Sequence, residues 1–334
     1  KIRLAASWSI EEKAYVLSWG GGKRLEGYSY SPPFDEFFLI GCKASKLVEE
    51  VLGGKVGANT LVLRKLGGEH VVYSAEKIAG VLHIPDAGCR PRGYYRGVET
   101  KDVELGALVR ANGSVLEEFR EVSLNIIRRL SKEADVVAVP WSGGKDSTLA
   151  LLMALEACGP KRVLAVYVDT GVDFPHTQEY VERLSAKLGV RLMKVRARVR
   201  EELEGGAPYP SHDNRWCTKL KIDALKSALA TLLGRVMVVV GDRDSESEAR
   251  SRRPPVREEE GRVVVAPLKQ WSTAHVQLEL ARRGIPTNPL YELGFYRLGC
   301  FLCPALRSWE VYVVLRSGIA ERLSADKLFA EFIR

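Results

Sequence analysis

The sequence predicts an α/β protein in which a parallel-sheet domain follows a small α+β domain. Residues 136–240 alternate short, continuously apolar segments with segments of helical periodicity, which is the pattern of a parallel sheet covered by helices on both faces. Residues 1–110 instead contain short β-type runs broken by glycine. A helical pattern begins just after them, so we expect a small accessory domain over 1–110 and a larger domain over 111–334.

The composition is that of a globular protein. The 334 residues are 46% hydrophobic and 28% charged, and no stretch approaches the roughly 20 apolar residues that a membrane span needs. The first residues do not resemble a secretory signal, so a cytoplasmic protein is expected. The net charge of +8 suits phosphate-bearing partners, but it does not choose between a small nucleotide and RNA. Abundant Arg, Glu, Val and Leu with little Gln and Asn hint at a thermophilic source.

The N-terminal domain is expected to be mostly β-structure. Runs rich in β-branched and aromatic residues at 14–19, 60–63 and 70–73 predict strands, and apolar periodicity at 44–51 predicts a helix. Residues 74–77 are expected to open another short helix. No motif in this domain has a chemistry that its residues identify, so binding of RNA or of a partner is the expected role.

The larger domain is expected to alternate strands and helices. Its first helix should start near residue 113, with Ser114 as N-cap and Glu117 three residues later. Strands are expected at 136–140, 162–168, 191–195 and 236–240, and helices between them at 147–157, 176–188 and 222–233. Ligands of such sheets bind beyond the carboxyl ends of the strands. A glycine loop at 142–147, Asp169 and Arg243 all follow such ends.

The glycine loop predicts a phosphate-binding site. Its glycines allow close backbone approach and positive φ, and the first amides of the following helix point at a bound anion. The loop is neither a Walker A sequence, which has four residues between its first glycine and Gly-Lys, nor a spaced-glycine dinucleotide fingerprint. The alternative is a turn that only joins a strand to a helix. The expected nucleotide-binding residues of the loop are Ser142, Gly143, Gly144, Lys145, Asp146 and Ser147.

The loop resembles the signature of the PP-loop ATP pyrophosphatases, within the adenine-nucleotide α-hydrolase (Rossmann-like) fold. The resemblance implies an enzyme that cleaves ATP between the α and β phosphates and releases pyrophosphate. Further segments, in order along the chain, are similar to the phosphoadenosine-phosphosulfate (PAPS) reductase-like branch. They are Val-Asp-Thr-Gly-Val-Asp-Phe-Pro-His-Thr at 168–177, Arg-Trp-Cys-Thr-Lys-Leu-Lys at 215–221, Gly-Asp-Arg-Asp-Ser-Glu-Ser at 241–247, 284–291 and Gly-Cys-Phe-Leu-Cys at 299–303.

The resemblance also suggests roles for individual residues. Asp169 and Thr170 end a strand, where they are expected to meet ribose, adenine or hydrated Mg²⁺, although nearby side chains also fit helix capping. Asp146 is expected to help position Mg²⁺ between the phosphates. Arg243 is expected to bind phosphate or sulfate oxygens through its guanidinium, and the alternative is a solvated charged loop. Lys145, Asp146 and Arg243 are therefore the expected catalytic residues.

Three cysteines are candidate metal ligands. Cys300 and Cys303 form a Cys-x-x-Cys pair, which alone suggests zinc, iron–sulfur or redox chemistry. The resemblance adds Cys217, although cluster-bearing reductase relatives have Cys-Cys there and this chain has Cys217-Thr218. Three thiolates are expected to hold a [4Fe–4S] cluster with one open iron. The alternatives are Zn²⁺ completed by His212 or another residue, and buried inert thiols.

These features lead to one expected function and two alternatives. The loop keeps its Lys-Asp pair, and residues 323–334 lack the cysteine of thioredoxin-using PAPS reductases. We therefore expect an ATP-dependent adenylylating enzyme of sulfur transfer, with tRNA thiolation as one form. The expected partners are an adenine nucleotide with Mg²⁺, a sulfur donor, tRNA and a second copy in a homodimer. The alternatives are a PAPS or adenylyl-sulfate reductase, and a nucleotide- or RNA-binding protein without turnover.

Overall fold

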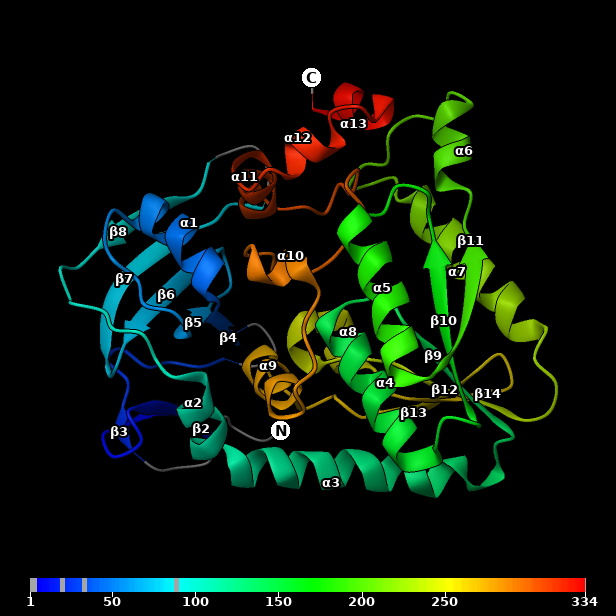
Figure 1. Cartoon of the computed structure of the whole chain (residues 1–334), viewed down its shortest axis with the longest axis horizontal. Helices are drawn as coiled ribbons and strands as arrows, with labels where there is room; N and C mark the ends of the chain where they lie inside the picture. Colours follow the sequence, from blue (N-terminus) through cyan, green and yellow to red (C-terminus); the bar gives the residue numbers. More distant parts are fainter. Residues whose placement is uncertain (1–4, 19–21, 32–34, 87–89, 334) are drawn as a thin grey trace.

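Two sheet systems lie side by side in the computed structural model, which describes residues 5–18, 22–31, 35–86 and 90–333 (Figure 1). The N-terminal strands, blue to cyan, form antiparallel sheets, and the strands after residue 135 form a mostly parallel sheet. The prediction of a parallel-sheet α/β domain preceded by a smaller α+β region is confirmed. Trp19, at the end of the expected strand 14–19, lies outside the described residues.

The described residues up to 104, which we call the accessory module, contain two antiparallel sheets. The first has the order β2-β1-β3, with β1 (Ala5–Ser9), β2 (Ala14–Ser18) and β3 (Lys23–Arg24). The second has the order β4-β5-β6-β7-β8, with β4 (Glu36–Ile40), β5 (Thr60–Arg64), β6 (Glu69–Ser74), β7 (Lys77–His83) and β8 (Arg92–Tyr95). Helix α1 (Cys42–Leu52) packs on β7 and β8.

The larger sheet has the order β11-β10-β9-β12-β14-β13, and only β13 and β14 pair antiparallel. The strands are β9 (Val136–Pro140), β10 (Val163–Asp169), β11 (Arg191–Arg196), β12 (Val236–Val239), β13 (Val256–Glu259) and β14 (Arg262–Val265). The chain leaves β9 toward β10 and β11, then returns to β12 on the other side of β9. The order therefore reverses between β9 and β12, which is where open α/β sheets bind their ligands.

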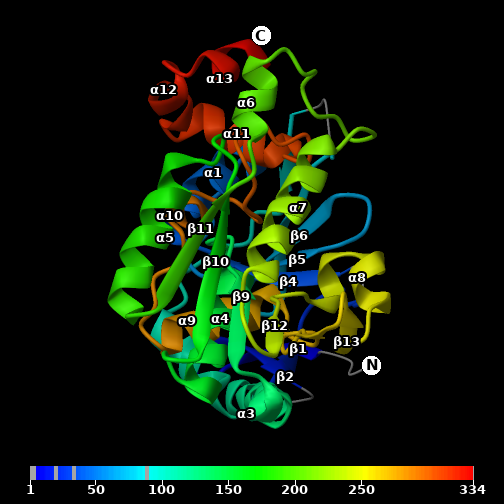
Figure 2. The ribbon, with the colours of Figure 1, turned by 90° about the vertical axis from the view of Figure 1, so that its right-hand side faces the viewer.

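Helices cover both faces of this sheet, with α5 and α7 on opposite sides (Figure 2). Val137 and Val139 of β9 face the core cluster that contains α4 and α5, whereas Ala138 faces the cluster that contains α7. This alternation follows from the two-residue repeat of a strand. The helices before and within the sheet are α2 (Leu105–Ala111), α3 (Gly113–Leu130), the 3₁₀ turn Ser131–Glu133, α4 (Lys145–Cys158), α5 (Pro175–Leu188), α6 (Val199–Glu204) and α7 (Trp216–Ala230).

The C-terminal part of the chain returns to the accessory module. Its elements are the 3₁₀ turn Asp244–Glu246, α8 (Glu248–Arg252), α9 (Thr273–Arg282), α10 (Pro289–Glu292), α11 (Ser308–Arg316), α12 (Ile319–Leu323) and α13 (Lys327–Phe332). Gln277 of α9 pairs with both backbone groups of Leu39 on β4, at 2.8 and 3.0 Å. The accessory sheet is therefore hydrogen-bonded to the helical layer of the larger sheet.

Hydrophobic clusters continue across the expected boundary near residue 110. Phe37 and Leu61 of the accessory sheet belong to the same cluster as Val139 of β9 and Leu149 of α4. On the other face of the accessory sheet, Ile40 and Val62 share a cluster with Phe295 and Trp309 of the C-terminal segments. The accessory module is thus packed on both faces by later parts of the chain. The division 1–110 and 111–334 stays a prediction about the sequence.

Two local expectations are wrong. Residues 74–77 form the turn between β6 and β7, because the flanking runs pair as a hairpin and Ala75 takes a positive φ of 49°. Ser114 is not the N-cap of α3, because Asn112 precedes the helix and Gly113 begins it. The buried Asn112 side chain instead fastens α3 to β2, accepting from Leu17 N (2.7 Å) and donating to Tyr15 O (2.8 Å).

No helix among the described residues is both long enough and apolar enough to cross a membrane.

Candidate nucleotide site

A cavity of about 640 Å³ lies where the larger sheet reverses its order, beyond the carboxyl ends of β9 and β12. Its volume is within the range typical of small-molecule sites. One wall is the glycine loop after β9 together with residues 241–243 after β12. The opposite wall comes from β4, β5 and α1 of the accessory module and from residues 294–310. The accessory module is therefore part of the cavity, which its sequence did not indicate.

The glycine loop has the conformation that its sequence predicts. Gly143 has a φ of 72°, which L side chains rarely adopt, and a Cβ at Gly144 would lie 3.2 Å from Ser142 Oγ. Helix α4 follows directly, and its first α-helical hydrogen bond runs from Thr148 N to Gly144 O (2.8 Å). The amides of Asp146 and Ser147 precede that bond, so they have no acceptor within the helix. They are the donors that an anion at this helix start would meet.

Side chains hold the loop against the sheet and the C-terminal segment. Trp141 is buried after β9, and its Nε1 donates to Thr148 Oγ1 (2.9 Å). The hydroxyls of Ser142 and Ser147 are 3.0 Å apart. The phenol oxygen of Tyr291 accepts from Lys145 N (3.2 Å). The loop is thus fixed before any ligand is bound.

Lys145 is buried, with 4% of the residue exposed. Two of the three N–H groups of its ammonium have acceptors in the protein. Its Nζ lies 2.9 Å from Asp146 Oδ2 and 3.3 Å from Tyr296 O, and it sits 5.1 Å above the Tyr291 ring centre. An ammonium has three N–H donors, so one remains for a ligand in the cavity. Lys145 is therefore a fixed cation in this structure.

Arg243 has its partners within the protein. Each of its guanidinium nitrogens donates to the protein, Nε to Asp146 Oδ1 at 2.6 Å and Nη1 to both oxygens of Glu36 at 3.1 Å. Nη2 donates to Thr273 Oγ1 at 2.9 Å. The side chain is 3% exposed, and its donors are hydrogen-bonded to acceptors within the protein. In this structure Arg243 positions Asp146, and binding of phosphate oxygens by its guanidinium stays a prediction.

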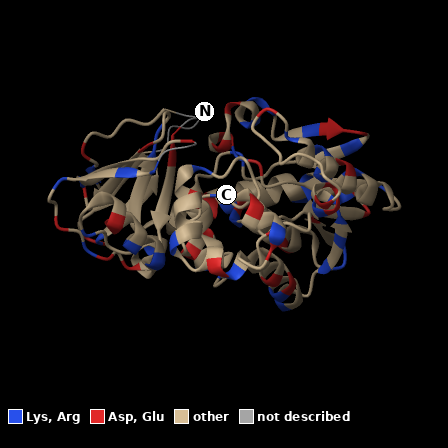
Figure 3. Cartoon of the chain, turned by 90° about the horizontal axis from the view of Figure 1, so that it is seen from above, with Lys and Arg blue, Asp and Glu red and all other residues tan. Residues whose placement is uncertain are grey.

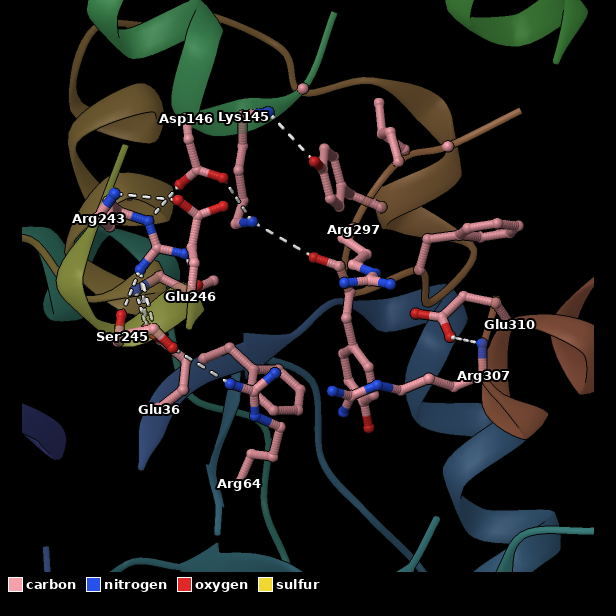
Figure 4. Close-up of a pocket in the computed structure, with 18 of the residues that line it drawn as sticks. Glu36, Arg64, Lys145, Asp146, Arg243, Ser245, Glu246, Arg297, Arg307 and Glu310 are labelled. Atoms are coloured by element: carbon pink, nitrogen blue, oxygen red, sulfur yellow. Dashed lines mark hydrogen bonds and ion pairs between the residues drawn. The ribbon is translucent and has the colours of Figure 1, made fainter. Parts of the chain in front are cut away.

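Glu36, Arg243, Asp146 and Lys145 form one buried chain of alternating charges (Figure 4). Burial raises the pKa of Glu36 and Asp146, but the neighbouring cations outweigh it and hold the pKa of both carboxyls below its ordinary value. Burial likewise lowers the pKa of Arg243, and Asp146 and Glu36 raise it above its ordinary value. Glu36, Asp146 and Arg243 are therefore charged near neutral pH. The sequence did not predict a role for Glu36, because no motif lies near it.

Asp169 and Thr170 do not line the cavity. Asp169 pairs with Arg196 (2.8 Å) and accepts from Gly171 N (2.7 Å), and Thr170 is fully buried with its hydroxyl accepting from Val172 N (3.3 Å). Asp169 ends β10 and Thr170 follows it, and β10 lies one strand outside the point where the order reverses. An adenosine contact at these residues stays a prediction.

The three candidate cysteines surround Lys221 of α7. Cys217 lies in the first turn of α7, and Asp173 forms a backbone bridge with Cys300. Burial lowers the pKa of the Lys221 ammonium, but Cys300, Asp173, Cys303 and Cys217 together raise it. A hydrogen bond between the Cys300 and Cys303 thiols lowers the pKa of Cys303 to about 5 and raises that of Cys300. Cys303 also lines the cavity.

The cysteines do not form a metal site in this structure. Across residues 5–18, 22–31, 35–86 and 90–333, no three His, Cys, Asp or Glu side chains are grouped so that they could hold a metal ion. Lys221 stands among the thiols, and His212, the expected fourth zinc ligand, is exposed. The donors present here do not fit a cluster or zinc, and such a cofactor stays a prediction.

The wall opposite the glycine loop carries charged residues that sequence reasoning missed (Figure 4). They are Arg64, at the end of β5, and Arg297, Arg307 and Glu310 from the C-terminal segment. Arg297 lies between two segments of the family resemblance, 284–291 and 299–303, and neither its type nor its spacing marked it. The other three lie outside every matched motif, so only the fold brings them to the cavity.

Comparisons with known proteins place the larger domain in a family. A family model described as the phosphoadenosine phosphosulfate reductase domain matches residues 136–306, just over half of the chain. Adenosine 5'-phosphosulfate reductase of Streptomyces coelicolor is 30% identical over 206 residues, covering 60% of this chain and 84% of that protein. An uncharacterized protein of Methanocaldococcus jannaschii is 32% identical over 215 residues, covering 63% of this chain and 45% of that protein. The chain spans about half of that relative and 50% of a second one from the same organism.

Among solved structures, the phosphoadenylyl-sulfate reductase of Candida auris is 20% identical, with a TM-score of 0.45, and covers 55% of this chain and 93% of that chain. The family match begins at β9 and ends just before Arg307, so it includes the glycine loop, residues 241–247 and the cysteine pair. The expected PAPS reductase-like relationship is confirmed. The chain belongs to the phosphoadenosine phosphosulfate reductase domain family.

Proposed function

We propose that this chain is an ATP-dependent adenylylating enzyme of sulfur transfer. The observation that carries the proposal is the glycine loop with an intact, buried Lys145–Asp146 pair at the head of α4, facing the cavity. Free first-turn amides and one unused ammonium donor suit the oxygens of a triphosphate. Membership of the family supports an enzyme that acts on an adenine nucleotide.

In the proposed reaction, an oxygen of the acceptor substrate attacks the α-phosphorus of Mg-ATP. A new bond forms between that oxygen and the α-phosphorus, the bond from the α-phosphorus to the bridging oxygen breaks, and pyrophosphate leaves. The amides of Asp146 and Ser147 and the ammonium of Lys145 stabilise negative charge on the phosphates without rearranging. Mg²⁺ arrives with ATP and takes one or two protein carboxylates, and Asp146 is the carboxylate at this loop.

Sulfur transfer would follow adenylylation. A sulfur nucleophile attacks the activated carbon of the adenylylated substrate, and AMP leaves with the oxygen. A sulfide donor would supply the sulfur directly, whereas a persulfide donor would leave a disulfide to the substrate, which a second thiol breaks by forming a disulfide with the donor sulfur. Cys303 is the thiol that lines the cavity. The metal at the cysteines, a tRNA acceptor and a homodimer remain proposals. In the view of Figure 3, Lys and Arg are interspersed with Asp and Glu over both halves of the chain, so the basic surplus alone does not favour tRNA.

Reduction of adenylyl sulfate is the second candidate. The Streptomyces coelicolor relative carries that name, and this chain covers 84% of it. The pKa of about 5 at Cys303 would supply a thiolate in the cavity near neutral pH. That thiolate would attack the sulfur of adenylyl sulfate and release AMP, and Cys300 would then release sulfite by forming a disulfide with Cys303.

Product analysis separates the two candidates. The full chain is incubated anaerobically with Mg-ATP, with and without tRNA and sulfide, and pyrophosphate and AMP are measured. Parallel reactions contain adenylyl sulfate or PAPS and a dithiol reductant, and sulfite is measured. Pyrophosphate from ATP supports the proposal. Sulfite without any ATP turnover would replace it with the reductase.

A further inference from the structure

Three arginines converge on the wall of the cavity that faces the glycine loop (Figure 4). Arg64 comes from the accessory module, and Arg297 and Arg307 come from the segment that joins α10 to α11. We call them the arginine cluster. They lie within one cavity with Lys145 and Asp146, but two of the three are outside the residues that match the family model.

The cluster has few internal partners for its charge. Arg64 Nη2 donates only weakly to Ser245 O (3.4 Å), and Arg297 Nη2 donates to Ala305 O (2.7 Å). Both acceptors are neutral carbonyls, and neither arginine has an ion pair within 4.0 Å among the residues that the structure describes. Arg307 pairs at 3.2 Å with Asp86, which is 79% exposed, so solvent screens that pair.

Burial makes the positive charge of Arg64 costly. It lowers the pKa of the Arg64 guanidinium, and nearby Arg307 and Arg243 lower it further, whereas Glu36 opposes them. Both oxygens of Glu36 accept from Arg243, so one carboxylate is shared between the charges of two guanidinium groups. Guanidinium groups gathered on one wall of a cavity, two of them without an ion pair among the described residues, form a site for an oxyanion.

Glu310 provides a second, independent sign of a ligand. This residue is fully buried at the cavity, Oε2 accepts from Arg307 N (3.0 Å), and Oε1 has no hydrogen-bond partner among the described residues. Buried polar atoms without a partner are uncommon in folded proteins. Burial raises the pKa of Glu310, which favours the protonated acid, and that form can donate to an oxygen of a bound anion.

The surroundings of the cluster are apolar. The side chains that line this half of the cavity include Phe38, Ile40, Val62, Leu82, Phe295 and Trp309. Four of them come from the accessory sheet and two from the C-terminal segment. Such walls suit the body of a ligand whose acidic end contacts the arginines.

We propose that the arginine cluster, with Glu310, is the subsite for the acceptor substrate, and that this acceptor is a small acid whose carboxylate or phosphate ester is bound to an apolar body. The accessory module thereby determines acceptor specificity, since it supplies Arg64 and most of the apolar wall. The subsite faces Lys145 across the cavity, so an acid oxygen held here is turned toward a nucleotide on the glycine loop. That consequence rests on the proposed function, whereas binding of the acid does not.

The test is calorimetric titration of the full chain with benzoate and, separately, with phenyl phosphate, in the presence of saturating AMPCPP. The nucleotide analogue occupies the glycine loop, so the remaining anion site is the one measured. We expect one of the two acids to bind in a 1:1 ratio, and the pair of titrations distinguishes a carboxylate from a phosphate ester. Arg64→Gln and Arg297→Gln should each weaken that binding about tenfold, because a charge-assisted hydrogen bond is lost.

Arg316→Gln is the matched control, because Arg316 is exposed at the other end of α11 from Arg307. It should leave the affinity unchanged. Arg297 is exposed, so Arg297→Gln should fold even if Arg64→Gln does not. Absence of binding by both acids, or equal affinity in wild type and in Arg297→Gln, would overturn the proposal. Failure of AMPCPP to bind would contradict the proposed function of the glycine loop and not the subsite. The same acid titrations, carried out without nucleotide on the Lys145→Ala variant, then test the subsite by itself.

Discussion

The two walls of the cavity carry charge in opposite ways. On the glycine-loop wall, Lys145 and Arg243 are neutralised by Asp146 and Glu36 within a buried chain of ion pairs. On the facing wall, the arginine cluster has neutral carbonyls and one exposed carboxylate as partners. The first wall is complete without a ligand, whereas the second is complete only with an anion. The glycine-loop wall is thus preorganised, and the arginine-cluster wall is the part of the site whose charge a ligand would balance.

The comparison also separates two kinds of sequence information. On the complete wall a contiguous loop supplies Lys145 and Asp146, and the fold adds Glu36 of β4 and Arg243. The incomplete wall has no such loop and is formed by residues from β5 and from the segment before α11. Substitutions on the first wall should therefore reduce both stability and nucleotide use, and substitutions on the second should change acceptor binding.

The largest effect is expected from Glu36→Gln. Removing one partner of a buried ion pair destabilises the protein, because the other charge stays buried. We expect a loss of about 3 kcal/mol in the free energy of unfolding, and not more, because Asp146 still pairs with Arg243. Urea unfolding of the wild type and the variant measures it. Glu292→Gln, in a pair whose side chains are 66% and 51% exposed, should cost less than about 1 kcal/mol. Equal losses in both variants would contradict the buried chain of charges.

The second largest effect is expected from Lys145→Ala. It removes the cation at the phosphates, so pyrophosphate release from Mg-ATP should fall about 100-fold, which corresponds to about 2.7 kcal/mol. Lys187→Ala, near the end of α5, is the control and should retain wild-type turnover. Initial rates at saturating ATP distinguish a loss of kcat from a loss of affinity. Turnover unchanged by Lys145→Ala would show that the ammonium does not act on the phosphates.

Glu310 should make stability depend on pH. Its pKa is raised above its ordinary value of 4.5, so its contribution is full below pH 4.5 and is lost as pH rises through the folded-state pKa. Glu310→Gln should remove this loss, so the variant gains stability relative to the wild type as pH rises above 4.5. Unfolding free energies measured at several pH values test this, with the exposed Glu118→Gln as control. A parallel pH profile in wild type and Glu310→Gln would contradict it.

The smallest effect is expected from Asp169→Asn. The Asp169–Arg196 pair is partly exposed, with 29% and 42% of the side chains accessible, so its loss should cost about 0.5 kcal/mol. Nucleotide affinity should stay at the wild-type value, because Asp169 lies outside the cavity lining. Titration with ATP decides it. A tenfold loss of affinity would restore the adenosine contact that the sequence suggests.

The local parts of the fold could be predicted because their signals are local. The run before Ser142 is β-branched, the loop is rich in glycine, and the next helix is apolar, so strand, loop and α4 follow from neighbouring residues. The same holds for Cys300 and Cys303, whose spacing is visible in the chain.

The remaining features depend on long-range contacts. Glu36 pairs with Arg243, which lies 207 positions later in the sequence, and no residue near either of them predicts the pair. The sequence suggests a phosphate role for Arg243 by residue type, whereas its acceptors Glu36, Asp146 and Thr273 come from distant parts of the chain and only the fold shows them. The lysine among the three cysteines was missed for the same reason, because Lys221 lies four positions beyond Cys217 and reaches the pair only through the packing of α7.

The most direct test is equilibrium titration of the full wild-type chain with ATP, adenylyl sulfate and PAPS, repeated with Lys145→Ala. The account predicts one site for at least one of these nucleotides, with affinity that falls in the variant. No measurable affinity of the wild type for any of the three would contradict it.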